Sequence, residues 1–146
     1  MDYIEYAKID TIYERKPDFT VDTSVLKRPV LRTIDTWNVF EKIDGTNMRI
    51  CFDAEENAVS VRGRSNNAQI PGDLLTTLTK MFPTELFKEH IPCSNVILFG
   101  EGYGSGIQKV GNGYRKDKSF ILFDVLVDGK WWLEWKDIQD VAQKMG

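Results

Sequence analysis

Aromatic and β-branched residues are concentrated in three short stretches of the first half of the chain, separated by turn-forming residues. Such stretches are typical of strands, and the sequence predicts them at residues 36–43, 47–52 and 57–62. Asp44-Gly45 is a turn signal, so the first two strands are expected to form a hairpin. Residues 1–28 alternate only weakly and are predicted to form loosely structured strand and loop.

Helical and strand patterns share the second half of the chain. Apolar residues at helical spacing follow Asp73, which is a good N-cap residue, and they predict a helix that begins there. Further helices are expected over residues 84–89 and 135–145. Apolar runs at 95–99 and 119–127 predict buried strands, and Asp128-Gly129 predicts a hairpin into residues 130–133. Without strict β-α alternation, this order favours a single α+β domain over residues 1–146 with mostly antiparallel sheets.

Composition narrows the class of protein. With 146 residues and 42% hydrophobic content the chain can bury a core, and its net charge of −3 argues against coating nucleic acid through bulk charge. Cys51 and Cys93 do not make a disulfide framework and are interpreted as reduced thiols. The sequence has no leader-like N-terminus and no stretch long enough to span a membrane, so we expect an intracellular, cytoplasmic protein.

Lys42 lies in the heptapeptide Glu41-Lys42-Ile43-Asp44-Gly45-Thr46-Asn47, at the expected end of a strand. A neutral lysine amine is a good nucleophile, but an ordinary lysine is protonated at pH 7 and needs an environment that favours the neutral form. The glycine allows a sharp turn or a close approach of the backbone to a phosphate. The short string is also compatible with a surface lysine beside a hairpin turn.

Three later stretches carry side chains that suit nucleotide chemistry. Arg62-Gly63-Arg64-Ser65 ends a strand with two guanidinium groups, which bind phosphates well. Phe99-Gly100-Glu101-Gly102-Tyr103-Gly104 places an acid in a glycine-rich turn, and Phe120-Ile121-Leu122-Phe123-Asp124 is an aromatic strand. Each stretch also has a structural interpretation, because arginines pair with carboxylates, such an acid can be solvated, and strand phenylalanines commonly belong to the core.

In this order, the residues resemble the motifs of the covalent nucleotidyltransferases, which are ATP-dependent RNA and DNA ligases and mRNA capping enzymes. The closest resemblance is to phage-type RNA ligases. Glu41 to Asn47 resembles the nucleophile motif, Arg64-Ser65 the next motif, Phe99-Gly100-Glu101 the third, and Phe120 to Asp124 the aromatic strand after it. The loop at residues 103–109 and 113–115 also resembles that family, whose adenylation-domain fold is therefore expected.

The resemblance implies a reaction sequence. Lys42 would attack the α-phosphate of ATP, release pyrophosphate and form a lysyl-AMP, with Mg²⁺ or Mn²⁺ assisting. The AMP would pass to the 5′-phosphate end of an RNA or DNA strand, and a 3′-hydroxyl would then displace it to seal the strand. The metal would be bound by Glu101 and Asp44.

The resemblance also implies which residues bind the nucleotide. Glu41 would meet the adenine edge and Phe120 its face, whereas Phe123 is expected mainly in the core. The complete nucleotide-binding set is Glu41, Lys42, Ile43, Asn47, Arg64, Glu101 and Phe120.

A basic loop lies between the third motif and the aromatic strand. It carries Lys109, Arg115, Lys116 and Lys118 against one acid, Asp117. Such a run is commonly a solvated surface. Because it is adjacent to the motifs, it is also a candidate for contact with nucleic-acid phosphates.

The family pattern continues with a Glu-Gly strand and a Lys-x-Lys strand, and neither occurs after Trp132. The chain is therefore predicted to be the N-terminal part of an adenylation domain or a shortened relative, with missing C-terminal strands or self-association at an exposed edge. The leading hypothesis is an RNA ligase-type enzyme. The alternatives are a nucleotide-binding or nucleic-acid-binding module without turnover and an unrelated α+β protein with chance motifs.

Overall fold

The computed structural model describes residues 2–92 and 94–146, so the predicted thiol of Cys93 lies outside the described part. The chain forms two compact units, one of Met1–Tyr6 with Ile43–Gly146 and one of Ala7–Lys42. The prediction of a single domain over 1–146 did not anticipate this division. Among the described residues, none of the helices has the length and apolar character needed to cross a membrane.

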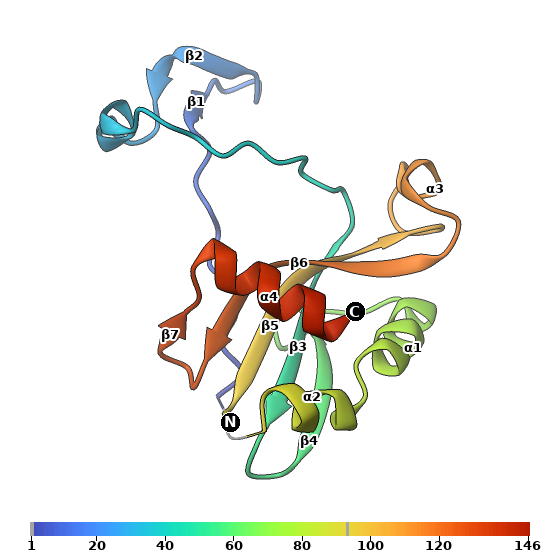
Figure 1. Ribbon diagram of the computed structural model, residues 1–146. Helices are drawn as coiled ribbons and strands as arrows, with labels where there is room; N and C mark the ends of the chain where they lie inside the picture. Colours follow the sequence, from blue (N-terminus) through green and yellow to red (C-terminus); the bar gives the residue numbers. More distant parts are fainter. Residues whose placement is uncertain (1, 93) are drawn as a thin grey trace. The chain divides into compact units, whose positions relative to one another are not determined.

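The main unit is built on a five-stranded sheet in which every pairing is antiparallel (Figure 1). Its strands are β3 (Thr46–Asp53), β4 (Ala58–Gly63), β5 (Val96–Gly104), β6 (Lys118–Val127) and β7 (Trp131–Trp132), in the order β4-β3-β5-β6-β7. The strands expected at 47–52, 57–62, 95–99 and 119–127 are present, and the expected hairpin continues into the short β7. These observations confirm the predicted α+β class with antiparallel sheets.

Helices cover one face of this sheet (Figure 1). They are α1 (Gly72–Met81), α2 (Thr84–His90) and α4 (Trp135–Met145), and a short α3 (Gly111–Tyr114) lies in the loop before β6. The hydrophobic core forms where the apolar side of the helices meets the even-numbered residues of β3 and β5. Its fully buried members include Met48, Ile50, Phe52, Leu74, Leu78, Phe87, Val96 and Leu98.

The start of α1 differs from the prediction. The N-cap is Pro71, whereas Asp73 lies within the first turn, where a carboxylate interacts favourably with the helix dipole. Asp73 also forms an ion pair with Lys118 of β6 at 2.7 Å. The acid therefore joins the helix to the sheet instead of capping the helix.

The other face of the sheet is partly covered by residues 2–6. Arg49 of β3 is fully buried there, and its guanidinium donates to the carbonyls of Tyr3, Ile4 and Gly63 at 2.8–2.9 Å. It also donates to the side-chain oxygen of Asn66 at 3.0 Å. Burial lowers the pKa of Arg49, and neutral oxygens satisfy its donors. Arg49 thus fixes the N-terminal residues to the sheet.

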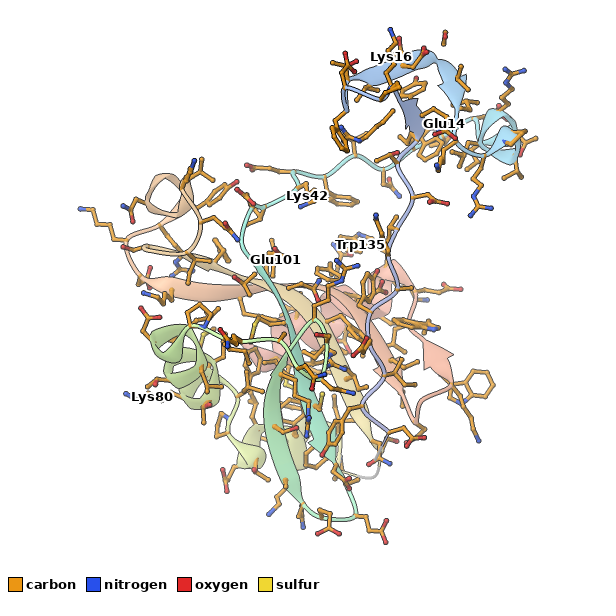
Figure 2. The ribbon with its side chains drawn as sticks, turned by 180° about the vertical axis from the view of Figure 1, so that it is seen from behind. Glu14, Lys16, Lys42, Lys80, Glu101 and Trp135 are labelled. Atoms are coloured by element: carbon orange, nitrogen blue, oxygen red, sulfur yellow. The ribbon has the colours of Figure 1, made fainter. Side chains whose placement is uncertain are left out.

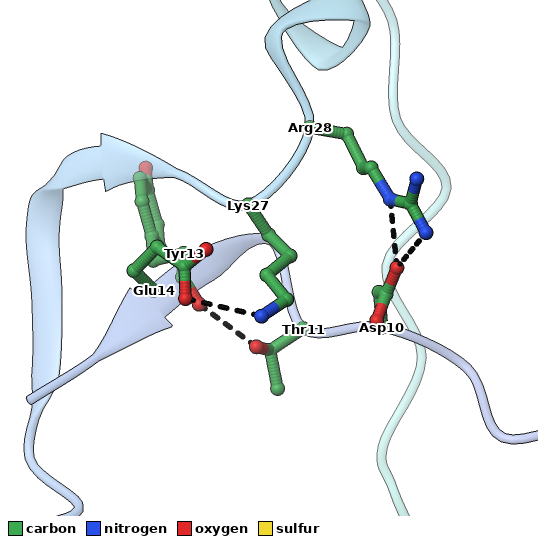
Figure 3. A network of polar contacts seen from close by, with 6 residues as sticks. All are labelled: Asp10, Thr11, Tyr13, Glu14, Lys27 and Arg28. Atoms are coloured by element: carbon green, nitrogen blue, oxygen red, sulfur yellow. Dashed lines mark hydrogen bonds and ion pairs between the residues drawn. The ribbon is translucent and has the colours of Figure 1, made fainter. Parts of the chain in front are cut away.

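The second unit, Ala7–Lys42, contains a two-stranded antiparallel sheet of β1 (Tyr13–Arg15) and β2 (Val21–Leu26), followed by the 3₁₀ helix η1 (Pro29–Thr33). None of its side chains is buried, as expected for a unit too small to enclose a core. Exposed polar contacts hold it together (Figure 3). Lys27 pairs with Glu14 at 3.1 Å and Arg28 with Asp10 at 2.7 Å.

The predicted strand at residues 36–43 was wrong. This segment has no regular secondary structure, and the predicted hairpin turn at Asp44-Gly45 leads directly into β3 instead. Trp37, Val39 and Phe40 have strand-forming side chains, but they are 45%, 88% and 61% exposed. Strand preference becomes a strand only when a neighbouring strand pairs with the segment, and the described residues supply no pairing strand here.

Candidate active site

Glu101 of β5 meets Gly45, the residue just before β3. The Gly45 N–H donates to Glu101 Oε1 at 3.2 Å, although the two residues are 56 positions apart (Glu101 is labelled in Figure 2). A methyl group on Gly45 would lie 2.4 Å from the carbonyl oxygen of Gly102. Glycine is therefore required at this position for close approach of the backbone, not for a turn with positive φ.

Asn47 lies directly opposite Glu101 in the β3–β5 register. Because side chains of paired residues share a face of the sheet, these two groups are neighbours. Asn47 Oδ1 is buried and has no hydrogen-bond partner in the described part of the structure. An unsatisfied buried acceptor is costly, so the fold itself makes no use of this oxygen and its presence here needs another explanation.

A β-bulge in β6 determines which phenylalanine lies on the Glu101 face. The β5–β6 register shifts between Phe99 and Gly100, so that Phe99 pairs with Asp124 and Gly100 with Leu122. Phe123 is the extra residue. It packs with Phe99 on the Glu101 face, and bulges of this kind re-aim side chains.

Phe120 lies on the opposite face. It packs against Phe82 in the helix-covered core, with ring centroids 5.3 Å apart. A methyl group on Gly100 would lie 2.1 Å from the Phe120 ring. The strand registers therefore place Phe120 and Glu101, both expected to bind the nucleotide, on opposite faces of the sheet. Phe123 packs against the buried cluster of Cys51, Ile97, Phe99 and Leu126, as expected for a core residue. That this cluster lies on the Glu101 face follows from the bulge, which no local pattern in the sequence indicates.

Tyr6 connects the N-terminal segment to the bulge. Its hydroxyl donates to Asp124 Oδ2 at 2.6 Å, and its ring meets Phe123 edge-on with centroids 5.0 Å apart. Burial, followed by the hydrogen bond and the charge of Asp124, raises the pKa of Tyr6 above its ordinary value. Trp132 stacks on Phe99 with centroids 5.3 Å apart. An aromatic surface thus extends along this face from the bulge.

The nucleophile motif is divided between the two units. Glu41 and Lys42 end the second unit, and Ile43 begins the main unit (Lys42 is labelled in Figure 2). Only Ile43 and Asp44 separate Lys42 from Gly45 in the chain. The structure therefore fixes the backbone just after the candidate nucleophile.

The loop between β5 and β6 supplies two further side chains to this backbone. The Asp44 N–H donates to the Tyr114 hydroxyl at 3.2 Å, and Gln108 Nε2 donates to the Gly45 carbonyl at 3.0 Å. The resemblance of this loop to the family implied no role for Gln108 or Tyr114. Their partners are distant in sequence, so only the fold identifies their contacts.

The arginines predicted to bind phosphate occupy different environments. Arg62 lies opposite Arg49 in β4, and its guanidinium stacks over the Tyr3 ring at 3.5 Å from the centroid. It is therefore a packing residue. Arg64 follows the end of β4 and is exposed, so it is available to a ligand.

The cations of the predicted basic loop divide into two kinds. Arg115 pairs with Asp117 at 2.6 Å, and Lys118 pairs with Asp73 at 2.7 Å. Each partnership lowers the pKa of the aspartate involved. Lys109 and Lys116 are exposed on the loop. The positive charge available to a nucleic acid is thus smaller than the sequence indicated.

Glu101 accepts a hydrogen bond from Gly45, the residue that follows Asp44. The two predicted metal ligands, Asp44 and Glu101, are therefore close to each other. Within the described ranges, no three His, Cys, Asp or Glu side chains form a group that could hold a metal ion. The carboxylates suit Mg²⁺ or Mn²⁺, which commonly take their remaining ligands from substrate phosphates and water.

Comparison with known proteins places this geometry in context. A family model described as RNA ligase matches residues 35–146. The search of curated proteins gave no match. Among solved structures, Naegleria gruberi RNA ligase is similar in a mutant with AMP and Mn, in a mutant with ATP and Mn, and in a form with PPi, each with a TM-score of 0.57 and 21% identity. Each match covers 71% of this chain and 30% of the other, so the chain spans under a third of those proteins.

Proposed function

Because the chain belongs to the RNA ligase family, we propose that it binds ATP on the Glu101 face of the five-stranded sheet and accepts AMP on Lys42. The observation that carries this proposal is the hydrogen bond from Gly45 to Glu101. It brings the nucleophile motif and the acidic motif together, as a common nucleotide site requires. The Naegleria gruberi structures with ATP, AMP and Mn support the choice of nucleotide and divalent ion.

The chemical step is a nucleotidyl transfer. The neutral amine of Lys42 would attack the α-phosphorus, the bond to pyrophosphate would break, and the amine would lose a proton as the P–N bond forms. A divalent ion would neutralise triphosphate charge and assist the leaving group. The protein itself would mainly position the reacting groups, which is how proteins accelerate this class of reaction most strongly.

The residues of the Glu101 face would recognise the nucleoside. Asn47 Oδ1 lacks a partner among the described residues and would accept a hydrogen bond from a ribose hydroxyl, and Glu101 would bind the ribose or the metal ion. Phe123 replaces Phe120 as the residue proposed to stack on the base, because it lies on the same face as Glu101. Glu41, Ile43 and Arg64 remain proposed contacts to the nucleotide on the strength of the motif alone.

The later steps of strand sealing are also part of the proposal. AMP would pass from Lys42 to the 5′-phosphate of an RNA or DNA end, and a 3′-hydroxyl would displace it. Lys109 and Lys116, exposed on the loop beside this site, would contact strand phosphates. Arg115 and Lys118 are proposed as weaker contacts, because aspartates already neutralise them.

Intact-mass measurement after incubation with ATP and Mg²⁺ tests the adenylation step. An increase equal to one AMP, absent from Lys42→Ala and from Lys42→Arg, is the expected result. ATP binding without an adduct would instead support the alternative, a nucleotide-binding module without turnover. If the chain neither binds ATP nor forms an adduct, both functions are refuted.

A further inference from the structure

Gln108 has an unusual backbone conformation for its residue type. Its φ is 55°, in the left-handed region that residues other than glycine, asparagine and aspartate seldom occupy. Residues held in this region persist only where the surrounding structure imposes the conformation, and they are concentrated at functional sites. The conformation of Gln108 is therefore expected to serve its contacts.

The surrounding loop imposes this conformation from both sides. Ile107, immediately before Gln108, is only 3% exposed and belongs to the main core, and its N–H donates to the Gly104 carbonyl at 3.0 Å. On the other side, a methyl group on Gly111 would lie 2.1 Å from the Gly104 oxygen, so the two ends of the loop are in close contact. Gln108 is held between a buried anchor and a closed loop.

The side chain of Gln108 extends from this loop to the nucleophile segment. Its amide donates to the Gly45 carbonyl, whereas Glu101 accepts the Gly45 N–H. The N–H and the carbonyl of Gly45 are thus both hydrogen-bonded to side chains from other parts of the fold. Tyr114, from the same loop as Gln108, accepts the N–H of Asp44. These three contacts restrain Asp44 and Gly45, the two residues that follow Lys42 and Ile43.

We propose that Gln108, assisted by Tyr114, is a positioning residue for Lys42. The loop holds Gln108 in a strained conformation so that its amide fixes Gly45, and the fixed backbone restricts where the Lys42 amine can lie. This proposal rests on the proposed adenylation of Lys42 and adds a residue to it. Gln108 would act through the backbone and would not need to touch ATP.

Two substitutions separate positioning from loop stability. Gln108→Gly removes the amide and relieves the positive φ, whereas Gln108→Asn tolerates the positive φ but is one methylene too short to keep the present contact. Val110→Ala, at a 49% exposed position of the same loop with negative φ, is the matched control. If the contact of Gln108 with Gly45 serves only to stabilise the loop, both variants should lower the melting temperature and leave the rate of adduct formation unchanged.

The measurement is single-turnover formation of the AMP adduct over a range of ATP concentrations. For both Gln108 variants we expect the maximal rate to fall about tenfold or more, as displacement of a reacting group commonly costs. The ATP concentration at half-saturation should change less than about threefold, since the contacts that bind ATP before the reaction are retained. Melting temperatures should be unchanged for Gln108→Asn and unchanged or higher for Gln108→Gly, and Val110→Ala should match the wild type in both measurements.

Amide hydrogen exchange gives a second readout. The Gly45 N–H should exchange faster in Gln108→Gly than in the wild type, while Ile50 in the middle of β3 keeps its protection. An adduct that forms at the wild-type rate in both variants would overturn the role of Gln108 but leave the proposed function intact. A wild-type chain that forms no adduct would overturn the proposed adenylation itself, and the role of Gln108 with it.

Discussion

Glu101 accepts the backbone N–H of Gly45 at 3.2 Å and joins β5 to the segment that follows the candidate nucleophile. This contact needs only an acceptor oxygen, so a neutral side chain of the same shape could make it as well. The negative charge of Glu101 is what a metal ion would require. A single acid can thus have two functions, one in holding the backbone and one in binding the nucleotide. Substitutions that remove only its charge separate them.

Glu101→Gln should retain the fold and slow adenylation. The glutamine oxygen can still accept the Gly45 N–H, so the free energy of unfolding should fall by no more than about 1 kcal/mol. Loss of the negative charge should slow AMP-adduct formation by about tenfold or more, because the metal and ribose contacts weaken. Glu101→Ala should lose both stability and activity. Wild-type adenylation by Glu101→Gln would contradict the assigned role.

Gly45→Ala should destabilise the protein and impair the site. Its methyl group would meet the Gly102 carbonyl at 2.4 Å, and β5 cannot move away without breaking its pairing with β3. Overpacking of this kind costs about 1–3 kcal/mol in the free energy of unfolding. Gly113→Ala is the control, because a methyl group there meets no atom within 4 Å. Denaturant unfolding of both variants measures the difference, and equal stability would refute the close approach.

The two phenylalanines of β6 should respond differently to replacement by leucine. Phe123→Leu should weaken ATP binding, which calorimetric titration would detect, because the ring proposed to stack on the base is lost. Phe120→Leu should leave ATP affinity unchanged. It should lower the free energy of unfolding by about 1–2 kcal/mol through poorer packing against Phe82. If Phe120→Leu weakens ATP binding and Phe123→Leu does not, Phe120 is the residue that stacks on the base.

Arg49→Leu should release the N-terminal residues from the sheet. The carbonyls of Tyr3, Ile4 and Gly63 would lose their donor, and each buried acceptor left unsatisfied costs about 1–3 kcal/mol. Arg49→Lys should recover only part of the loss, because an ammonium cannot reproduce the planar guanidinium. Proteolysis near residues 2–6 measures release. Wild-type resistance in Arg49→Leu would show that other contacts suffice.

Acidification should weaken the ion pair between α1 and β6. The hydrogen bond and charge of Lys118 hold the pKa of Asp73 below its usual range, so folding favours the carboxylate. The stabilisation is present above the ordinary aspartate pKa and is lost as the pH falls through the lower folded value. Asp73→Asn should therefore lower the melting temperature at pH 7 but have little effect near pH 2. An equal effect at both pH values would exclude the ion pair as the cause.

Local sequence was a reliable guide where one element could be judged by itself. The apolar run that became β5 is buried from Val96 to Phe99, whereas β6 is buried only at Ser119, Val125 and Leu126. The helices that the apolar spacing predicted, α1 and α4, cover the sheet. Residues 36–43 show where this reasoning fails. Trp37, Val39 and Phe40 have the composition of a strand, but a strand exists only with a pairing strand beside it, which composition does not reveal.

By itself, the sequence determined the order of motifs around Lys42, Arg64 and Glu101 and the α+β class, because both depend on residue types and local periodicity. Tertiary structure alone decided which groups share a face. The bulge at Phe123 turned that ring toward the Glu101 side and left Phe120 in the core, and the loop brought Gln108 to Gly45. These relationships depend on strand register and on contacts between distant residues, which no local pattern in the chain specifies.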